Sequence, residues 1–143
     1  MESWQLTSYP ELDMVIRLVI AAFLGGVIGY ERAHALKPAG IRTHLLVCVG
    51  AALFTIVSIY GFGENSDPSR VAAGVVVGIG FLGAGTILRQ EKAVVGLTTA
   101  ATVWAVAGIG LAIGTGLYVV GAVSAVIALI ALRFLPHHHP YGD

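Results

Sequence analysis

The chain contains five apolar stretches, and each is close to the length that a helix needs to cross a lipid bilayer. The stretches cover residues 14–30, 43–60, 71–88, 97–113 and 116–135 of the 143-residue chain. A hydrocarbon core about 30 Å thick takes roughly 20 residues of helix to cross. Backbone groups in lipid must be hydrogen-bonded within the protein, and a helix achieves this inside one segment. The sequence therefore predicts an all-α bundle of five membrane-spanning helices.

The composition excludes an ordinary water-soluble domain. Hydrophobic residues make up 57% of the chain and charged residues only 11%, which is too few to cover the surface of a soluble domain. We expect one transmembrane domain over residues 14–135, surrounded by lipid and without a nucleic-acid partner. Residues 1–13 are interpreted as an external amphipathic leader. Residues 136–143 are interpreted as a short cytoplasmic tail, whose three histidines are either native or the remnant of a purification tag.

The distribution of Lys and Arg indicates the orientation in the membrane. Lys and Arg gather in the loop 31–42, in the loop 89–96 and at Arg133. The acids Glu64 and Asp67 lie in the loop between the second and third apolar stretches. Cytoplasmic loops of membrane proteins carry an excess of Lys and Arg. The sequence therefore predicts five spans with the N-terminus outside and the C-terminus in the cytoplasm. A single broken segment in place of the last two spans would put the C-terminal tail outside.

The third stretch is rich in glycine, which suits close packing between helices in a membrane. Wound as a helix, it places Gly74, Gly78 and Gly85 on one face and Gly80 and Gly83 on the opposite face. We therefore predict a central helix with neighbours on two sides. Small residues predict similar packing faces on other helices: Ala22, Gly26 and Gly29 on the first, Ala101, Ala105, Gly108 and Ala112 on the fourth, and Gly121, Ala125 and Ala128 on the fifth. These faces favour a homodimer or higher homo-oligomer, although packing within one chain would use the same residues.

Polar residues gather where the first, second and third spans meet the cytoplasm. The predicted polar cluster consists of Glu31, Arg32, Arg42, Thr43, His44 and Arg89. One interpretation is ordinary anchoring of cations at the membrane surface; the other is a contact with a partner, an anionic lipid head group or an ion. Anchoring explains Glu31 least well, because an acid does not suit the C-terminus of a helix. We expect its partner to be Arg32, Arg42 or Arg89.

At the outer side, Asp67 and Arg70 flank the start of the third span. Asp67 before Pro68 is typical of a helix N-cap followed by proline at the first helical position. The alternative is a cation contact, since one or two carboxylates are enough to hold hydrated Mg²⁺. Asp67 and Glu31 are therefore weak Mg²⁺ candidates, and we expect no other cofactor. Arg17, one turn inside the first span, is expected to reach the membrane surface with its charged end.

The sequence does not favour an enzyme. Ser58 and Ser124 lie within apolar stretches and have no nearby histidine, so they lack the base that activates a serine nucleophile. Cys48 is the single cysteine and lies in an apolar run, where a small packing residue is expected.

Three segments resemble the signature blocks of the MgtC/SapB (YhiD) family of bacterial inner-membrane proteins. They are GxxIGYERAHALKPAGIRTHLLVCVGAALF at residues 25–54, DPSRVAAGVVVGIGFLGAGTILR at residues 67–89, and GLTTAATVWAVAGIGLAIGTGLY at residues 96–118. The positions that match the recurrent polar motifs of the family are Glu31, Arg32, Arg42, Thr43, His44, Asp67, Arg70 and Arg89.

This resemblance implies a multi-pass bacterial inner-membrane protein associated with magnesium homeostasis, acid stress and virulence. It implies a regulatory protein that contacts other inner-membrane proteins, such as the ATP synthase or a cation-transport ATPase. The alternative is a transporter or channel for Mg²⁺ or protons. MgtC carries an ACT-like cytoplasmic domain after its last span, and we expect this chain to represent a shorter form without that domain.

Overall fold

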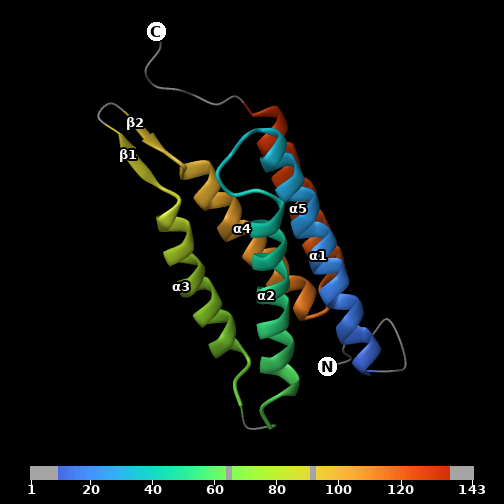
Figure 1. Ribbon diagram of the computed structural model, residues 1–143. Coiled ribbons are helices and arrows are strands. Elements are labelled where there is room, and N and C mark those ends of the chain that lie inside the picture. The colour runs from blue at the N-terminus through green and yellow to red at the C-terminus, as the bar shows by residue number, and fades with distance from the viewer. Residues whose placement is uncertain (1–9, 64–65, 91–92, 136–143) are drawn as a thin grey trace.

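The computed structural model describes residues 10–63, 66–90 and 93–135. In this part of the chain it contains five helices and one two-stranded antiparallel hairpin (Figure 1). The helices are α1 (Pro10–His34), α2 (Ile41–Tyr60), α3 (Ser69–Gly85), α4 (Leu97–Gly114) and α5 (Tyr118–Phe134), and the strands are β1 (Leu88–Gln90) and β2 (Ala93–Val95). The predicted helical bundle and its five helices are confirmed.

The first helix begins earlier and ends later than predicted. It starts at Pro10, with Glu11 and Asp13 in its first turn and Arg32 and His34 in its last. Proline fits the first helical turn, acids favour the positive end of the helix dipole, and basic residues favour the negative end. Residues 10–13, which were assigned to the leader, are therefore part of α1.

The third helix ends earlier than predicted, and the β1–β2 hairpin that follows was missed. The Thr86 hydroxyl donates a hydrogen bond to the Gly83 carbonyl at 2.8 Å, next to the end of α3. Leu88 then pairs with Val95 across the hairpin. Gly96 leads into α4 with a φ of 93°, and a Cβ there would overlap the Thr86 carbonyl oxygen. The positive φ and the close contact with Thr86 both require glycine at position 96. The connection between α3 and α4 is therefore a tight turn into and out of the hairpin.

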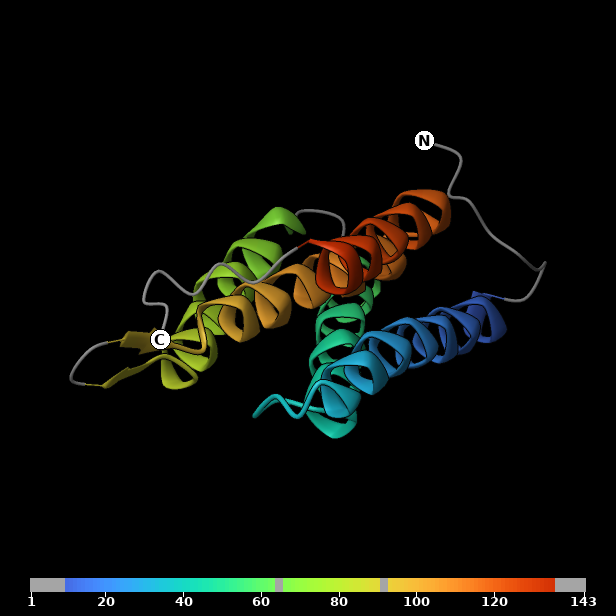
Figure 2. The same cartoon turned by 90° about the horizontal axis from the view of Figure 1, so that it is seen from above.

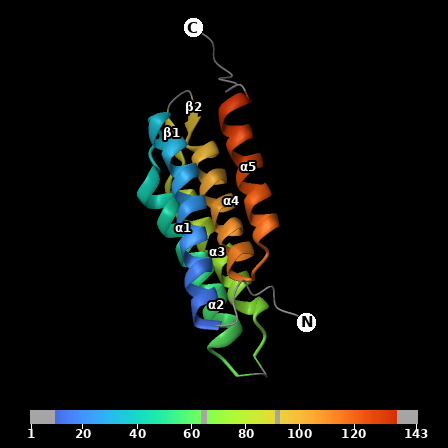
Figure 3. The same ribbon diagram turned by 90° about the vertical axis from the view of Figure 1, so that its right-hand side faces the viewer.

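The centre of the bundle is formed by α2 and α4, and the prediction that α3 is central is wrong. Helix α4 contacts all four other helices, whereas α3 rests on α2 and α4. Figures 2 and 3 show α3 on the other side of α2 and α4 from α1 and α5. Most of α3 is therefore exposed, with only Ile79 and Gly83 buried.

The glycines of α3 mostly face open space rather than neighbouring helices of the chain. A Cβ built at Gly74, Gly78, Gly80 or Gly85 would meet nothing within 4 Å, and only Gly83 lies against α4, at Ala100. The glycine pattern correctly indicates faces that allow close approach. It does not show whether a neighbour in the same chain fills such a face, and at Gly74, Gly78, Gly80 and Gly85 none of the described residues does.

Close helix packing occurs instead around α2. A Cβ at Gly29 of α1 would lie 2.6 Å from the Ile41 Cα, so α1 and α2 approach each other closely at this glycine. On α4, a Cβ at Gly110 would overlap the Cys48 carbonyl oxygen, and one at Gly114 would lie 2.6 Å from the Thr55 Cβ. Glycine at these positions lets the α1 and α4 backbones approach α2 closely.

Two other predicted packing glycines contribute less. A Cβ at Gly26 would be in ordinary contact with the Leu45 side chain at 3.9 Å, and one at Gly108 would meet nothing within 4 Å. Gly108 therefore makes no close helix contact among the described residues, because α4 turns a different face inward. On α5, Gly121 and Ala125 are buried as predicted.

Three helices, α1, α2 and α4, are long and apolar enough to cross a membrane. Helices α3 and α5 are apolar but have 17 residues each, about 26 Å at 1.5 Å per residue. This length is slightly below the thickness of a typical hydrocarbon core. The fold is that of a membrane protein, while the number of spans and the orientation stay predictions.

Candidate functional site

Part of the predicted polar cluster comes together at the end of α1. Arg32 Nε lies 2.9 Å from Glu31 Oε2, so Arg32 is the ion-pair partner expected for Glu31. Arg32 is only 1% exposed and therefore does not behave as a surface anchor. A guanidinium removed from water needs a charged partner and hydrogen-bond acceptors. The structure thus places a charged pair inside the bundle, where the sequence also allowed a simple anchoring role.

His44 is completely buried in the first turn of α2. Its Nδ1 lies 2.9 Å from the carbonyl oxygen of Gly40. A Cβ built at Gly29 would lie 3.1 Å from the Cβ of His44. The absence of a side chain at Gly29 therefore gives His44 room between α1 and α2. Arg32 follows Gly29 by three residues on the same face of α1 and is paired with Glu31. We call Glu31, Arg32 and His44 together the inner polar site.

The other members of the predicted cluster lie elsewhere. Arg42 and Thr43 are exposed at the start of α2, and Arg89 is exposed on β1. Figures 1 and 2 show the β1–β2 hairpin away from the end of α1. In the described ranges, the ion pair recorded for Glu31 is the one to Arg32. Helix periodicity could not show this, because it does not determine which loops meet in space.

A second polar site, at the opposite end of the bundle, was missed by the sequence analysis. Arg17 donates from Nε to Asp13 Oδ2 at 2.7 Å and from Nη1 to the carbonyl oxygen of Gly114 at 2.8 Å. The hydroxyl of Tyr118 donates to Asp13 Oδ1 at 3.1 Å. The Arg17 guanidinium carbon also lies 6.0 Å from the centre of the Tyr60 ring. These residues form the outer polar site.

The expectation that Arg17 reaches the membrane surface is wrong. Arg17 and Asp13 are each 1% exposed. Arg17 ends at the last carbonyls of α4, where the helix dipole favours a positive charge, and its charge is compensated by Asp13. The signal available in the sequence was the spacing of four residues between Asp13 and Arg17, which places both on one face of a helix.

Asp67 lies in the loop before α3 and is exposed. Its Oδ1 accepts a hydrogen bond from the backbone N–H of Ser69 at 2.9 Å, which is the bond that a capping aspartate makes at a helix start. Hydrogen bonding by Ser69 lowers the pKa of the Asp67 carboxyl below its usual value. The Ser58 hydroxyl donates to the Pro68 carbonyl at 3.1 Å and ties the loop to α2. Arg70 is exposed in the first turn of α3.

The two candidate Mg²⁺ ligands lie at opposite ends of the bundle. Glu31 is near the end of α1, and Asp67 precedes α3. Among the described residues, no group of three or more His, Cys, Asp or Glu side chains is placed to hold a metal ion. Each carboxylate could thus supply one ligand to a hydrated ion of its own. Because they lie at opposite ends of the bundle, the two could not bind the same ion.

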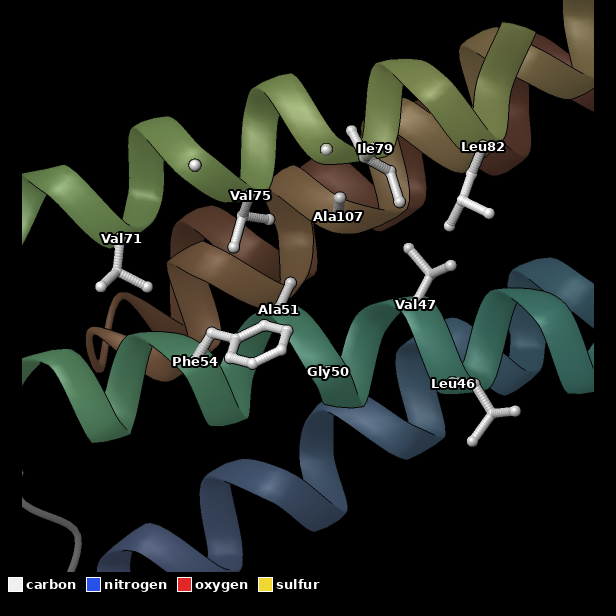
Figure 4. Close-up of a pocket in the computed structure, with 12 residues that line it drawn as sticks. Leu46, Val47, Gly50, Ala51, Phe54, Val71, Val75, Ile79, Leu82 and Ala107 are labelled. Carbon is white, nitrogen blue, oxygen red and sulfur yellow. The ribbon is translucent and has the colours of Figure 1, made fainter. Parts of the chain in front are cut away.

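An apolar groove lies between α2, α3 and α4 and has a volume of about 570 Å³. Its walls carry only apolar side chains and glycine. In Figure 4, Val71 and Val75 of α3 point across the groove toward α2, where Phe54 lies opposite. Gly74 and Gly78 also line it. A groove with these walls suits an apolar chain or helix rather than a hydrated ion.

Comparison with known proteins identifies the family of this chain. The family model described as "MgtC family" matches residues 18–141. The chain is 49% identical over 128 residues to Escherichia coli K12 "Putative magnesium transporter YhiD", covering 85% of this chain and 60% of that protein. It is 42% identical over 139 residues to Bacillus subtilis "Protein SapB", covering 92% and 60%. It is 49% identical over 115 residues to Brucella abortus (strain 2308) "Protein MgtC", covering 80% and 48%.

The chain thus spans about 60% of the length of the first two of these relatives and about half of the third. No solved structure matches it. The family match begins in the third turn of α1 and includes the rest of the bundle to the end of α5. The chain therefore belongs to the MgtC family.

Proposed function

We propose that this chain is a bacterial inner-membrane protein that acts in magnesium homeostasis by binding other membrane proteins through α3. The observation that carries the proposal is the exposed side of α3, where glycines without neighbours adjoin an apolar groove. Each glycine in a helix costs about 1 kcal/mol relative to alanine. In a membrane, such positions favour association because they let the backbone of another helix approach closely.

The link to magnesium is supported by the family and by the name of the YhiD relative. The partner is a membrane protein, for which the ATP synthase and a cation-transport ATPase are the candidates that the family resemblance implies. A homodimer through α3 is a further part of the proposal, because symmetric dimers are the commonest homo-oligomers. Roles in acid stress and virulence are likewise proposed from the family alone.

Transport of Mg²⁺ or protons is the second candidate function. It is favoured by the name of the YhiD relative. The groove beside α3 does not support it, since its lining offers no oxygen ligand from a side chain, and Mg²⁺ is held by carboxylates, phosphates and water. An enzymatic role is not proposed.

The proposed contact is tested by crosslinking in native membranes. A photoreactive amino acid is placed at Val77 on α3, which is 78% exposed, and the matched control is placed at Val119 on α5, which is 76% exposed. We expect discrete crosslinked species from position 77 and only lipid adducts from position 119. Equal patterns at the two positions, or lipid adducts alone at position 77, would contradict the proposal.

A flux assay distinguishes the two functions. The purified protein is placed in liposomes containing an Mg²⁺ indicator or a pH indicator. We expect no flux above that of empty liposomes. Flux that disappears in Glu31→Gln or Asp67→Asn, and persists in the exposed control Arg133→Gln, would establish transport and overturn the regulatory proposal.

A further inference from the structure

The inner polar site contains buried polar atoms that other protein groups do not satisfy. Among the described residues, Nη1 of Arg32 and Nε2 of His44 are buried and have no hydrogen-bond partner. Nε of Arg32 and Oε2 of Glu31 face each other at 2.9 Å as an ion pair, but without hydrogen-bond geometry. Leaving a buried polar group without a hydrogen bond costs about 1–3 kcal/mol. Unsatisfied groups on three neighbouring side chains therefore point to a bound molecule.

The hydrogen bond to Gly40 determines which nitrogen of His44 carries the proton. A backbone carbonyl oxygen only accepts, so Nδ1 at 2.9 Å from it must donate. In the neutral ring, Nε2 then has a lone pair and accepts a hydrogen bond. The site thus contains an acceptor at His44 and a donor at Arg32 Nη1, and these two atoms require a ligand that can both donate and accept.

The charges and the burial limit what the ligand can be. Glu31 and Arg32 already compensate each other, so an anion or a cation would bring a net charge into a buried site, which is costly. The unsatisfied atoms have essentially no exposed surface, which favours a very small molecule. A water molecule has two donors and two acceptors and typically makes two to four hydrogen bonds when buried.

The placement of the three side chains agrees with a shared ligand. Gly29 and Arg32 are three residues apart, and therefore lie on the same face of α1. The Cβ of His44 lies against Gly29, so His44 packs on the face of α1 that carries Arg32. Glu31 joins this group through its ion pair with Arg32, whose Nε lies 2.9 Å from Glu31 Oε2.

We propose that the inner polar site binds one water molecule, which accepts a hydrogen bond from Arg32 Nη1 and donates to His44 Nε2 and Glu31 Oε2. This water joins the end of α1 to the start of α2 and donates to the ring nitrogen that the Gly40 hydrogen bond leaves unprotonated. No covalent bond is made or broken. The proposal concerns a site within the bundle and is independent of the contacts proposed for α3.

The test uses solid-state NMR of the full chain in liposomes, with ¹⁵N-labelled histidine and near-neutral pH. The His44 signals are assigned by their loss in His44→Asn. We expect Nδ1 to carry the proton, Nε2 to be unprotonated, and Nε2 to receive magnetisation from water. Exposed His34, whose Nδ1 lies 3.3 Å from the Tyr30 carbonyl, serves as an internal reference.

A pair of conservative variants locates the water. Arg32→Lys keeps the charge beside Glu31 but removes Nη1, and we expect the transfer from water to His44 Nε2 to fall to background while the tautomer persists. Arg42→Lys, at an exposed position of α2, should leave the transfer unchanged. Circular dichroism checks that each variant retains its helices.

Three outcomes would overturn the proposal. The first is a His44 ring protonated at Nε2 in the wild-type chain. The second is an Nε2 atom without transfer from water in a folded wild-type protein, or with transfer equal in Arg32→Lys. The third is a shift of the His44 signals on adding inorganic phosphate or chloride, which would assign the site to an anion instead.

Discussion

Arg17 on α1 donates a hydrogen bond to the carbonyl oxygen of Gly114, at the end of α4 and 97 positions later in the chain. The same guanidinium is paired with Asp13, which also accepts from Tyr118 on α5. Three helices are therefore joined through two buried charges. Polar contacts of this kind are directional, and they specify how the α4–α5 hairpin sits on α1.

We expect Arg17→Ala to destabilise the bundle by about 3–5 kcal/mol, because it leaves a buried carboxylate at Asp13 without its partner. Tyr118→Phe removes one hydrogen bond and should cost about 1–2 kcal/mol. Unfolding in detergent, monitored by circular dichroism, measures both effects. Arg133→Ala at an exposed position serves as the control. If Arg17→Ala were no more destabilising than this control, Arg17 would not be buried in an ion pair.

Two glycines of α4 should respond in opposite ways to alanine. Gly110→Ala forces a Cβ against the Cys48 carbonyl oxygen, so α4 must move away from α2, and we expect a loss of about 1–3 kcal/mol. Gly108→Ala places its Cβ in open space and should be neutral or stabilising by up to about 1 kcal/mol. The same unfolding measurement compares the two variants. An equal effect at both positions would contradict the packing of α4 on α2.

Gly96→Ala should loosen the connection between α3 and α4. The φ of 93° at Gly96 is unfavourable for alanine, and the new Cβ would overlap the Thr86 carbonyl oxygen. We expect at least about 1 kcal/mol of destabilisation and faster hydrogen exchange at the amides of β1 and β2. Gly63→Ala, which places its Cβ in open space, is the matched control. Unchanged exchange in the hairpin of Gly96→Ala would show that this backbone conformation is not needed.

The start of α3 should become less stable in acid. The pKa of Asp67 is lowered in the folded protein by hydrogen bonding from Ser69. The stabilisation that Asp67 gives to the start of α3 is therefore complete above the pKa of the carboxyl in the unfolded chain, about 3.9. It disappears as the pH falls through the lower pKa that the carboxyl has in the folded protein. Hydrogen exchange at the first amides of α3 measures this effect. Asp67→Ala should show fast exchange at all pH values, and a pH dependence in that variant equal to wild type would exclude Asp67 as its cause.

The orientation is tested by labelling single cysteines in intact cells. In a Cys48→Ala background, a membrane-impermeant thiol reagent should label Gly63→Cys and leave Lys37→Cys unlabelled. The physical reason is the excess of Lys and Arg in the loop that contains Lys37. Labelling of both positions after permeabilisation is the control. Labelling at position 37 alone in intact cells would reverse the predicted orientation.

Local sequence patterns were sufficient for the elements of this fold. Apolar length predicted five helices, and the small residues at Gly29, Gly121 and Ala125 correctly marked contact faces. The patterns failed at Gly108 and along α3, where a small-residue face occurs without a neighbour in the chain. Periodicity reports which residues share a face of a helix, but not what that face touches.

The candidate sites show the same contrast between what local patterns of residues predict and what they cannot predict. The sequence pointed to Glu31, Arg32 and His44 because polar residues gather where the predicted spans meet the cytoplasm. It also grouped Arg42, Thr43 and Arg89 with them, although the structure places these three on exposed surfaces. It missed the outer polar site, because the partners of Arg17 include a backbone carbonyl, which no residue type reveals.

The sequence by itself determined that this chain forms apolar helices suited to a bilayer, because length and hydropathy are properties of each segment alone. It also determined the family, through motifs that are local strings of residues. Only the tertiary structure decided that α2 and α4 form the centre, that Arg17 reaches Gly114, and that His44 lies against Gly29. These contacts join residues distant in the chain, and they depend on how backbones approach one another in three dimensions.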